Sequence, residues 1–264
     1  MQARDDLGHP VTIPAEVASI VSLVPSLTEA IASCDASLLV GATKYCSHPP
    51  ALAVERVGGT KNPDVPRIIE MKPDVVLANE EENRAPDLAA LRVAGISVWV
   101  TKIRTLAEAL GSLDRMITIA CRLPGPAWLD AAPAAWAQVG ERAVAGQTAQ
   151  AAPARPRLAI VPIWRRPWMV LGSDTFAGDL LARLGIVNVY ADHAERYPRI
   201  DLADLRQSGA EMVVLPDEPY RFGADDGPEA FPDLPAALVS GRHLTWYGPS
   251  LVEAPDVLSR QLRV

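Results

Sequence analysis

The residues with the clearest potential to bind a ligand lie in loops that follow predicted strands, and most of them are aromatic. Four of the five tyrosines and three of the six tryptophans fall in such loops, although the chain is only 5% aromatic. Large rings offer flat apolar area with a polar group at one end, which suits a large planar or macrocyclic ligand. The alternative is that the rings fill an interface between domains. These residues are Tyr45, Tyr197, Tyr220, Tyr247, Trp164, Trp168 and Trp246.

Acidic loops accompany the rings. The segment 79–84 (NEEENR) opens a predicted helix, where carboxylates complement the helix dipole. Three consecutive carboxylates exceed what a helix start needs, so some of them are candidates to face a ligand. A neighbouring loop carries a lysine and an asparagine that could pair with these acids or with the ligand, and residues 217–218 are the acidic counterpart in the second half. The candidates are Glu81, Glu82, Asn83, Lys61, Asn62 and Glu218.

Metal-binding and enzyme motifs are scarce. The four histidines show no HxxxH or HxH spacing, and with three scattered cysteines they form no zinc signature. His48 stands out by its loop: its imidazole could ligate a metal already held by a macrocycle, or only form a hydrogen bond, and Cys46 is a weaker candidate. No Walker A loop, GxGxxG or GxSxG motif is present. Residues 172–175 (GSDT) precede a predicted helix and could bind an anion or simply cap that helix.

The elements that must position these loops occur twice. Residues 68–82 and 205–218 each show a short amphipathic helix pattern, a polar break, an apolar strand and an acidic loop. Each half also opens with a β-rich run, at 19–24 and 158–163, followed by a helix pattern. Strands that alternate with helices predict mostly parallel sheets. Two similar lobes usually face each other across a ligand cleft.

The predicted fold class is therefore α/β, with two α/β lobes joined by a long rigid backbone helix and a ligand cleft between them. The predicted domains are an N-terminal lobe at 1–103, a connecting helical segment at 104–148 and a C-terminal lobe at 149–264. Within them we expect a helix opened by a capping box of Ser26 and Glu29, and a continuous helix at 106–121. We also expect a strand at 243–246 and a terminal helix from about Pro249.

Composition narrows the function classes. A chain of 264 residues with a net charge of −7 has no dense Lys/Arg stripe for nucleic acid. No stretch of about 18 apolar residues predicts a membrane span. The first residues lack an apolar signal region and a following lipid-anchor cysteine, so the sequence as written predicts a cytoplasmic protein, whereas a trimmed exported lipoprotein would look the same. Three scattered cysteines predict reduced thiols.

Six segments of the chain carry a resemblance to a known family. They are 19–31 (SIVSLVPSLTEAI), 41–50 (GATKYCSHPP), 57–83, 95–100 (GISVWV), 196–205 (RYPRIDLADL) and 215–222 (LPDEPYRF). On these segments the chain resembles the class III periplasmic-binding-protein superfamily, also called helical backbone metal receptors, and within it the cobalamin-binding branch. The resemblance implies two α/β lobes, one long backbone helix, little hinge motion and capture of a metal chelate such as a corrinoid, haem or siderophore.

The resemblance implies that His48 occupies the position at which the cobalamin binders have an aromatic residue that touches the corrinoid. Lys61 falls near a tryptophan of that site, and Tyr197 matches a tryptophan of the second lobe. Transport members also present one acidic residue per lobe to arginines of the membrane permease. The matching positions hold Pro66 and Ala203, which cannot pair with arginine. Docking to an ABC permease is therefore in doubt, unless Glu70 or Asp204 substitutes.

Three hypotheses follow. The first is a non-enzymatic solute-binding protein for a cobalamin-like or other metal chelate, with no intrinsic cofactor and no necessary transporter partner. The second is the exported substrate-binding component of an ABC uptake transporter. The third is a cytoplasmic enzyme that evolved on the same cleft, with Glu81, Glu82, His48 and Lys61 as acid–base groups.

Overall fold

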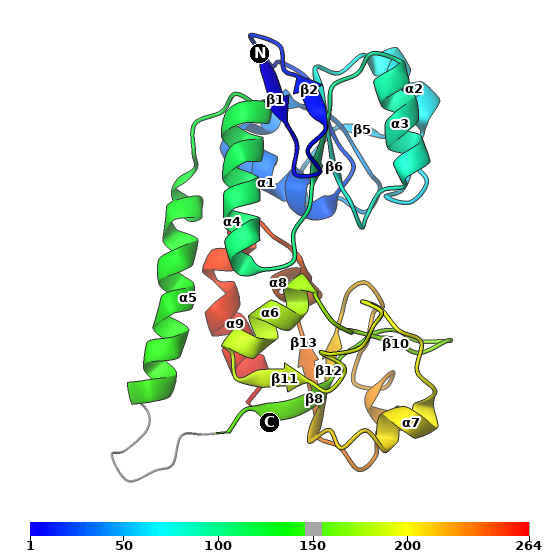
Figure 1. The fold of residues 1–264 in the computed structure, drawn as a ribbon, viewed down its shortest axis with the longest axis vertical. Coiled ribbons are helices and arrows are strands. Elements are labelled where there is room, and N and C mark those ends of the chain that lie inside the picture. Colours follow the sequence, from blue (N-terminus) through cyan, green and yellow to red (C-terminus); the bar gives the residue numbers. More distant parts are fainter. Residues whose placement is uncertain (146–154, 264) are drawn as a thin grey trace. The chain divides into compact units, whose positions relative to one another are not determined.

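A computed structural model of the chain describes residues 1–145 and 155–263 (Figure 1). The chain forms two compact units. Unit 1 holds residues 1–103, 107–130 and 247–249, and unit 2 holds residues 104–106, 131–246 and 250–264. The segment 104–148 that the sequence predicts as a connector is thus divided between the two units.

Unit 1 is built on a parallel sheet of five strands in the order β5-β4-β3-β6-β7. The central strands consist almost entirely of buried β-branched and aliphatic residues, as expected for a parallel sheet covered on both faces. The strands are β3 (Ile20–Ser22), β4 (Leu39–Ala42), β5 (Glu55–Arg56), β6 (Val75–Asn79) and β7 (Val98–Thr101).

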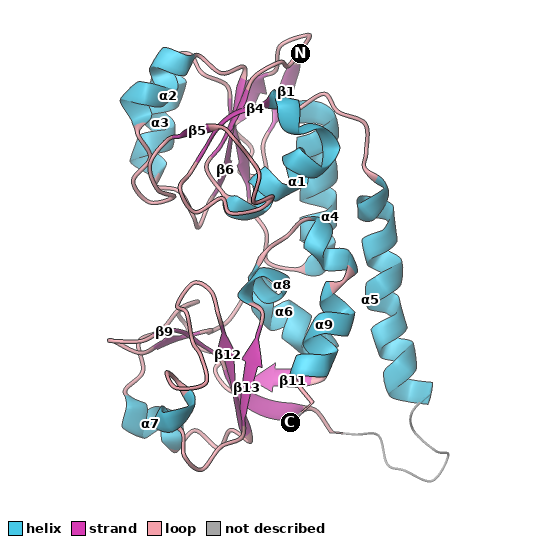
Figure 2. Ribbon diagram, turned by 180° about the vertical axis from the view of Figure 1, so that it is seen from behind, coloured by secondary structure: helices cyan, strands magenta, loops and turns pink. Residues whose placement is uncertain are grey.

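Helices cover both faces of this sheet (Figures 1 and 2). On one face, Ile68 of α2 (Val65–Met71) and Leu88 and Leu91 of α3 (Ala85–Val93) pack against the strands. The other face carries α1 (Pro25–Asp35), α4 (Leu106–Arg115) and a π-helical turn at Met116–Ala120. A short 3-10 turn at Ala36–Leu38 leads from α1 into β4.

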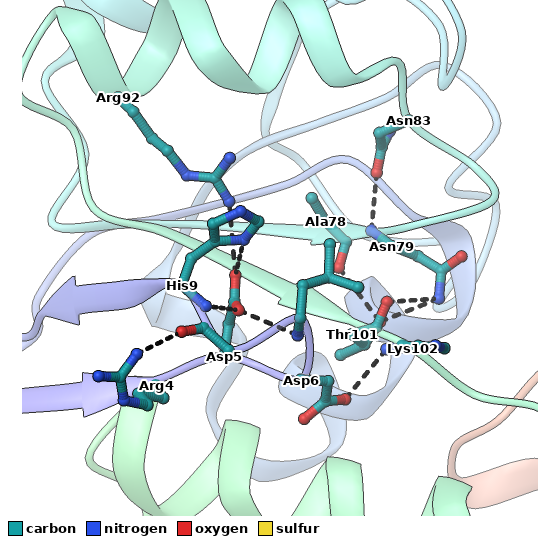
Figure 3. Close-up of polar contacts among 12 residues, drawn as sticks. Arg4, Asp5, Asp6, His9, Ala78, Asn79, Asn83, Arg92, Thr101 and Lys102 are labelled. Carbon is teal, nitrogen blue, oxygen red and sulfur yellow. Dashed lines mark hydrogen bonds and ion pairs between the residues drawn. The ribbon is translucent and has the colours of Figure 1, made fainter.

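A hairpin of β1 (Gln2–Arg4) and β2 (Pro10–Thr12) extends unit 1 at its N-terminus. Two consecutive aspartates at its turn hold it in place, as Figure 3 shows in part. Asp5 is buried and accepts hydrogen bonds from the backbone N–H of His9 (2.8 Å) and from Arg92 (3.4 Å). Asp6 accepts from the N–H of Lys102 (3.0 Å) and from Arg115 of α4 (2.9 Å).

Unit 2 repeats the plan with a parallel sheet of four strands in the order β11-β8-β12-β13. In both units the second strand lies on one side of the first, and the last two strands lie on the other side; unit 1 adds β5 at the outer edge of β4. The duplicated sequence pattern thus corresponds to α2–β6 in unit 1 and α7–β12 in unit 2. The strands are β8 (Arg157–Ile160), β11 (Ile186–Asn188), β12 (Met212–Pro216) and β13 (Ala236–Val239).

The helices of unit 2 lie on both faces of its sheet (Figure 2). Leu205 of α7 (Leu202–Arg206) packs on one face, and α6 (Phe176–Arg183), α8 (Gly241–Thr245) and α9 (Ala254–Gln261) cover the other. A small antiparallel hairpin, β9 (Pro162–Trp164) with β10 (Met169–Val170), follows β8. Short 3-10 turns lie at Pro228–Ala230 and Pro249–Val252.

Helix α5 (Ala127–Ala145) begins in unit 1, and its residues from Ala131 onward belong to unit 2. A tryptophan fixes it in each unit. In unit 1 the indole N–H of Trp128 donates to Ser33 Oγ (2.9 Å), and in unit 2 that of Trp136 donates to the Leu251 carbonyl (2.9 Å).

Several element predictions were wrong. The helix predicted from a capping box at Ser26 begins at Pro25, with Val24 at its N-cap and no side-chain cap, because proline at the first helical position already fits the helical φ. Residues 243–246 do not form a strand but belong mainly to α8, and the last strand of unit 2 is β13 instead.

Two further predicted elements are interrupted. The predicted run 158–163 divides at Val161 into β8 and β9, since Pro162 has no N–H to continue the sheet. The predicted continuous helix at 106–121 changes to a π-helical turn after Arg115.

Candidate functional site

The strand order of each sheet defines where a ligand site is expected. The order reverses between β3 and β6 in unit 1, and between β8 and β12 in unit 2. In open parallel sheets, ligands bind outside the carboxyl ends of the strands at such a reversal. The loops that leave β6 and β12 at these points are the acidic loops at residues 80–82 and 217–218.

In unit 1, two asparagines build the loop that follows β6 (Figure 3). Asn83 Oδ1 accepts the N–H of Asn79 (2.9 Å), and Asn83 Nδ2 donates to the carbonyls of Leu23 and Thr60 (3.3 and 3.0 Å). Asn79 in turn donates to Thr101 through Nδ2 (3.1 Å). Both asparagines are buried. Their amides thus hold the acidic loop to the sheet, whereas the sequence predicts Asn83 as a ligand contact.

The glutamates of this loop are presented by that scaffold. Asn79 Oδ1 accepts the backbone N–H of Glu81 (2.9 Å) and of Glu82 (3.3 Å). Burial raises the pKa of the half-buried Glu82 carboxyl, and the nearby charge of Lys61 partly offsets that rise. The Lys61 ammonium donates to the backbone carbonyl of Glu81, so the two neighbouring loops do meet, although the prediction was a pairing with the acidic side chains or with the ligand. Asn62, in contrast, accepts from Arg84 Nη1 (3.3 Å).

The loop after β4 carries an exposed ring. The Tyr45 side chain is 56% exposed, and the Lys44 ammonium lies 5.1 Å from its centroid. His48 is half-buried and its Nδ1 lies 3.1 Å from Ser47 Oγ. Cys46 is buried, with its Sγ at 3.0 Å from Thr28 Oγ1, so its thiol faces the interior of the unit.

In unit 2, three of the predicted rings and one phenylalanine form a connected aromatic cluster, which we call the aromatic platform. It consists of Trp164, Trp168, Tyr220 and Phe222. Trp164 meets Tyr220 edge to face, with centroids 5.5 Å apart. Tyr220 contacts Phe222 (4.7 Å), and Trp168 stacks on Phe222 (6.1 Å). Phe222 is buried, whereas Trp164 is 44% exposed. Three of the four residues were predicted site residues, and the platform leaves the Trp164 ring available at its edge.

A polar network fixes this platform. The Tyr220 hydroxyl donates to Asp226 Oδ2 (2.7 Å), and Arg165 forms ion pairs with both Asp226 and Glu229. The Arg165 guanidinium also lies over the Trp168 ring, 5.2 Å from its centroid. The hydrogen bond to Asp226 raises the pKa of Tyr220 and lowers the pKa of Asp226. Tyr220 is therefore held as a neutral hydrogen-bond donor, and this network was not predicted from the sequence.

The remaining predicted residues occupy different surroundings. Arg196 lies over the half-buried Tyr197 ring, 5.5 Å from its centroid. Trp246 is buried and its indole N–H donates to Glu218 Oε2 (2.9 Å), so these two candidates form one pair within unit 2. Tyr247, which belongs to unit 1, is also buried.

Among the residues that the structure describes, no three His, Cys, Asp or Glu side chains come together in an arrangement that could hold a metal ion. The role of His48 as a ligand of a metal held by a macrocycle stays a prediction.

The GSDT segment at 172–175 has a structural explanation. Thr175 caps α6 by accepting the N–H of Gly178 (3.2 Å), and Asp174 pairs with Arg104 (3.3 Å). A cavity of about 200 Å³ lies beside these residues within unit 2. It is smaller than the roughly 300–1,000 Å³ typical of small-molecule sites.

Comparison with known proteins gives the class. Residues 20–218 match the family described as periplasmic binding protein. Because this match spans more than half of the chain, the protein belongs to that family. The resemblance to the class III periplasmic-binding-protein superfamily is confirmed, and the relatives that match the chain include vitamin B12-binding proteins.

Particular relatives make the comparison concrete. A vitamin B12-binding protein of Vibrio cholerae is 26% identical over 209 residues, which cover 76% of this chain and 70% of the relative. The crystal structure of a periplasmic vitamin B12 binding protein of Vibrio cholerae aligns with a TM-score of 0.72 at 19% identity, over 95% of this chain and 98% of that one. The crystal structure of a periplasmic heme binding protein of Pseudomonas aeruginosa aligns with a TM-score of 0.73 at 21% identity, over 92% of this chain and 91% of that one. The two structures share the α/β fold of this chain.

No helix within residues 1–145 and 155–263 combines the length and apolar character needed to cross a membrane.

Proposed function

We propose that the protein is a non-enzymatic solute-binding protein that captures a metal chelate of the cobalamin, haem or siderophore kind. The observation that carries the proposal is the exposed ring of Trp164 beside the sheet of unit 2, with that of Tyr45 beside the sheet of unit 1. The names of the relatives agree with this ligand class. The cleft between lobes remains a prediction.

The test is a titration of the purified protein with cobalamin, haem and a set of ferric siderophores. We expect one of them to quench tryptophan fluorescence saturably, with a dissociation constant at or below the micromolar range. Ni²⁺ and Co²⁺ salts serve as the control and should leave the fluorescence unchanged. Binding of the bare ions but of no chelate would contradict the proposal.

A Trp164→Ala variant locates the site. Removing the ring should weaken chelate binding by about tenfold or more, since stacked aromatic contacts of this size contribute on the order of 1 kcal/mol beyond their buried area. Trp128→Phe is a matched control, because that tryptophan lies on α5 in unit 1, where it bonds to Ser33. Equal loss of binding in both variants would argue against the aromatic platform as the site.

The second candidate is the exported receptor of an ABC uptake transporter, which the family name favours. Such a receptor needs an acidic residue on each lobe that pairs with a permease arginine. The matching positions hold Pro66 and Ala203, which are the second residues of α2 and α7 and are both exposed. Neither can pair with a permease arginine. Of the possible substitutes, Glu70 pairs with Arg67 (3.1 Å), and Asp204 lies exposed on α7.

Cell fractionation of the producing organism separates an exported receptor from a cytoplasmic binder. Uptake assays then test coupling: the Pro66→Glu, Ala203→Glu double variant should gain transport if only the docking acids are missing. Transport by the unaltered chain would show that other residues dock. The enzyme hypothesis is tested by Glu82→Gln, which must reduce turnover of some substrate if that carboxyl acts in acid–base chemistry.

A further inference from the structure

Two exposed arginines are close neighbours of the aromatic platform along the chain. Arg166 lies in the turn between β9 and β10, and Arg221 follows Tyr220 in the loop after β12. Both side chains are exposed. Within the described part of the chain, neither guanidinium lies within ion-pair distance of a carboxylate. The loops of unit 2 thus carry two exposed positive charges, each within two residues along the chain of a ring of the platform.

The neighbouring acids are already engaged. Arg165 forms ion pairs with both Asp226 and Glu229, and Tyr220 donates a further hydrogen bond to Asp226. Arg166 lies in the turn of the β9–β10 hairpin, two residues along the chain from both Trp164 and Trp168 of the platform. Arg165 fixes the platform, and Arg166 remains available to a ligand.

The backbone at Arg166 supports the same assignment. Its φ of +69° lies in the left-handed region, which side-chain-bearing residues rarely adopt and glycine adopts freely. Glycine would suit this turn better as far as the backbone is concerned. A long charged side chain at a strained position is typical of functional sites, because the strain has to be offset by a gain elsewhere.

We propose that Arg166 and Arg221 bind carboxylate groups on the rim of a planar chelate whose ring lies against Trp164. This inference rests on the proposed function and narrows it: the preferred ligand carries peripheral carboxylates and is not a chelate whose periphery is made of neutral amides. Guanidinium groups bind carboxylates through two parallel hydrogen bonds, which gives orientation as well as affinity. The rings supply contact area for the chelate, and the arginines favour chelates that carry negatively charged carboxylates.

The test uses pairs of chelates that share ring and metal but differ in charge. The first pair is dicyanocobyrinic acid, with peripheral carboxylates, and dicyanocobinamide, in which amides replace them. The second pair is haem and haem dimethyl ester. We expect the carboxylate form of the ring that binds to bind at least tenfold more tightly. Arg166→Gln and Arg221→Gln should each remove most of that preference and leave the neutral form unaffected.

Matched variants separate charge from backbone effects. Arg166→Lys should retain part of the preference, whereas Arg166→Gly, which relieves the backbone, should lose it as fully as Arg166→Gln. Arg260→Gln is the control, since that exposed arginine lies on α9, which packs on β13. Equal affinity for both members of a pair, or unchanged preference in the arginine variants, would overturn the inference and leave the proposed function standing. Failure of every chelate to bind would reject both.

Discussion

The environment of the Glu82 carboxyl predicts how the free energy of unfolding depends on pH. Burial raises its pKa in the folded protein above the value of about 4 in an unfolded chain. Between those two values the folded protein binds more protons than the unfolded one, so the free energy of unfolding falls as the pH rises through that window. Glu82→Gln removes the buried charge. We expect the variant to be more stable than the parent at pH 7 and equally stable near pH 4.

Urea unfolding at the two pH values measures this difference. Glu16→Gln is the control, since that side chain is exposed and should show no such pH dependence. A Glu82→Gln variant that is less stable at pH 7 would mean that the Coulombic attraction of Lys61 outweighs the desolvation of the carboxyl.

At the scale of elements, the N-terminal hairpin depends on Asp6. Its carboxylate accepts hydrogen bonds from the Lys102 N–H, from Ser112 and from Arg115, and its side chain is only 9% exposed. Asp6→Ala leaves these donors unpaired at the junction of the hairpin, β7 and α4. We expect the free energy of unfolding to fall by about 2–3 kcal/mol. The loss is not larger because the Arg115 side chain is 41% exposed and water replaces part of the interaction.

The measurement for Asp6→Ala is urea unfolding followed by tryptophan fluorescence. Trp99 is fully buried, with Arg115 stacked 5.4 Å from its ring centroid, so it reports on this junction. Glu16→Ala provides the comparison. A change below about 0.5 kcal/mol would indicate that the hairpin is held by other contacts.

Gly172 fixes the close approach of two loops in unit 2. A Cβ atom there would meet the Glu195 carbonyl oxygen at 2.0 Å, a backbone atom that cannot rotate away. Gly172→Ala should therefore displace the loop that carries Tyr197 and destabilise the protein by more than about 2 kcal/mol. Gly111→Ala, where a Cβ meets nothing within 4 Å on α4, should instead stabilise it by up to about 1 kcal/mol. Thermal unfolding of both variants distinguishes these outcomes.

The elements show how far the sequence determines the fold. The short helix predicted at the start of the segment 68–82 is α2 (Val65–Met71), whose two ends are marked locally by Asp64, Pro66 and Lys72. The repeated helix–strand pattern also predicted a mostly parallel sheet in each half, and both sheets are parallel. The run 243–246 was predicted wrongly, since four residues are too few for a strand period to be told from a helix period. The hairpin β1–β2 was missed, as its anchors are Arg92, Lys102 and Arg115, about 90 or more residues away.

The candidate site divides in the same way. Loops after strands can be located from the sequence, so Tyr45, Trp164 and Tyr220 were named without the structure. The pair of Arg165 and Asp226, 61 residues apart, could not be named, because it depends on the path of β9, β10 and the loop after β12. Burial also could not be inferred: Trp246 was predicted at a ligand-facing rim, and it is 6% exposed.

At the scale of the whole molecule, the net charge of −7 and the two arginines beside the platform act on an anionic chelate in opposite directions. The net charge acts at long range and is screened over about 30 Å at 0.01 M salt and about 10 Å at 0.1 M. The contacts of Arg166 and Arg221 act only after docking. Raising the salt concentration over this range should therefore increase the association rate constant, since the repulsion is screened, and should also increase the dissociation rate constant.

Stopped-flow fluorescence of chelate binding at the two salt concentrations measures both rate constants. Arg166→Gln makes the net charge more negative and removes a docking contact. It should therefore make the association rate constant depend more strongly on salt and the dissociation rate constant depend less strongly on salt. Arg260→Gln changes the net charge equally, so it should strengthen the salt dependence of the association rate constant and leave that of the dissociation rate constant unchanged. This comparison separates the two effects, because the charge of the molecule is the same in both variants and only the position of the lost guanidinium differs. An association rate that falls with salt would mean that the local arginines, and not the net charge, govern the approach of the ligand.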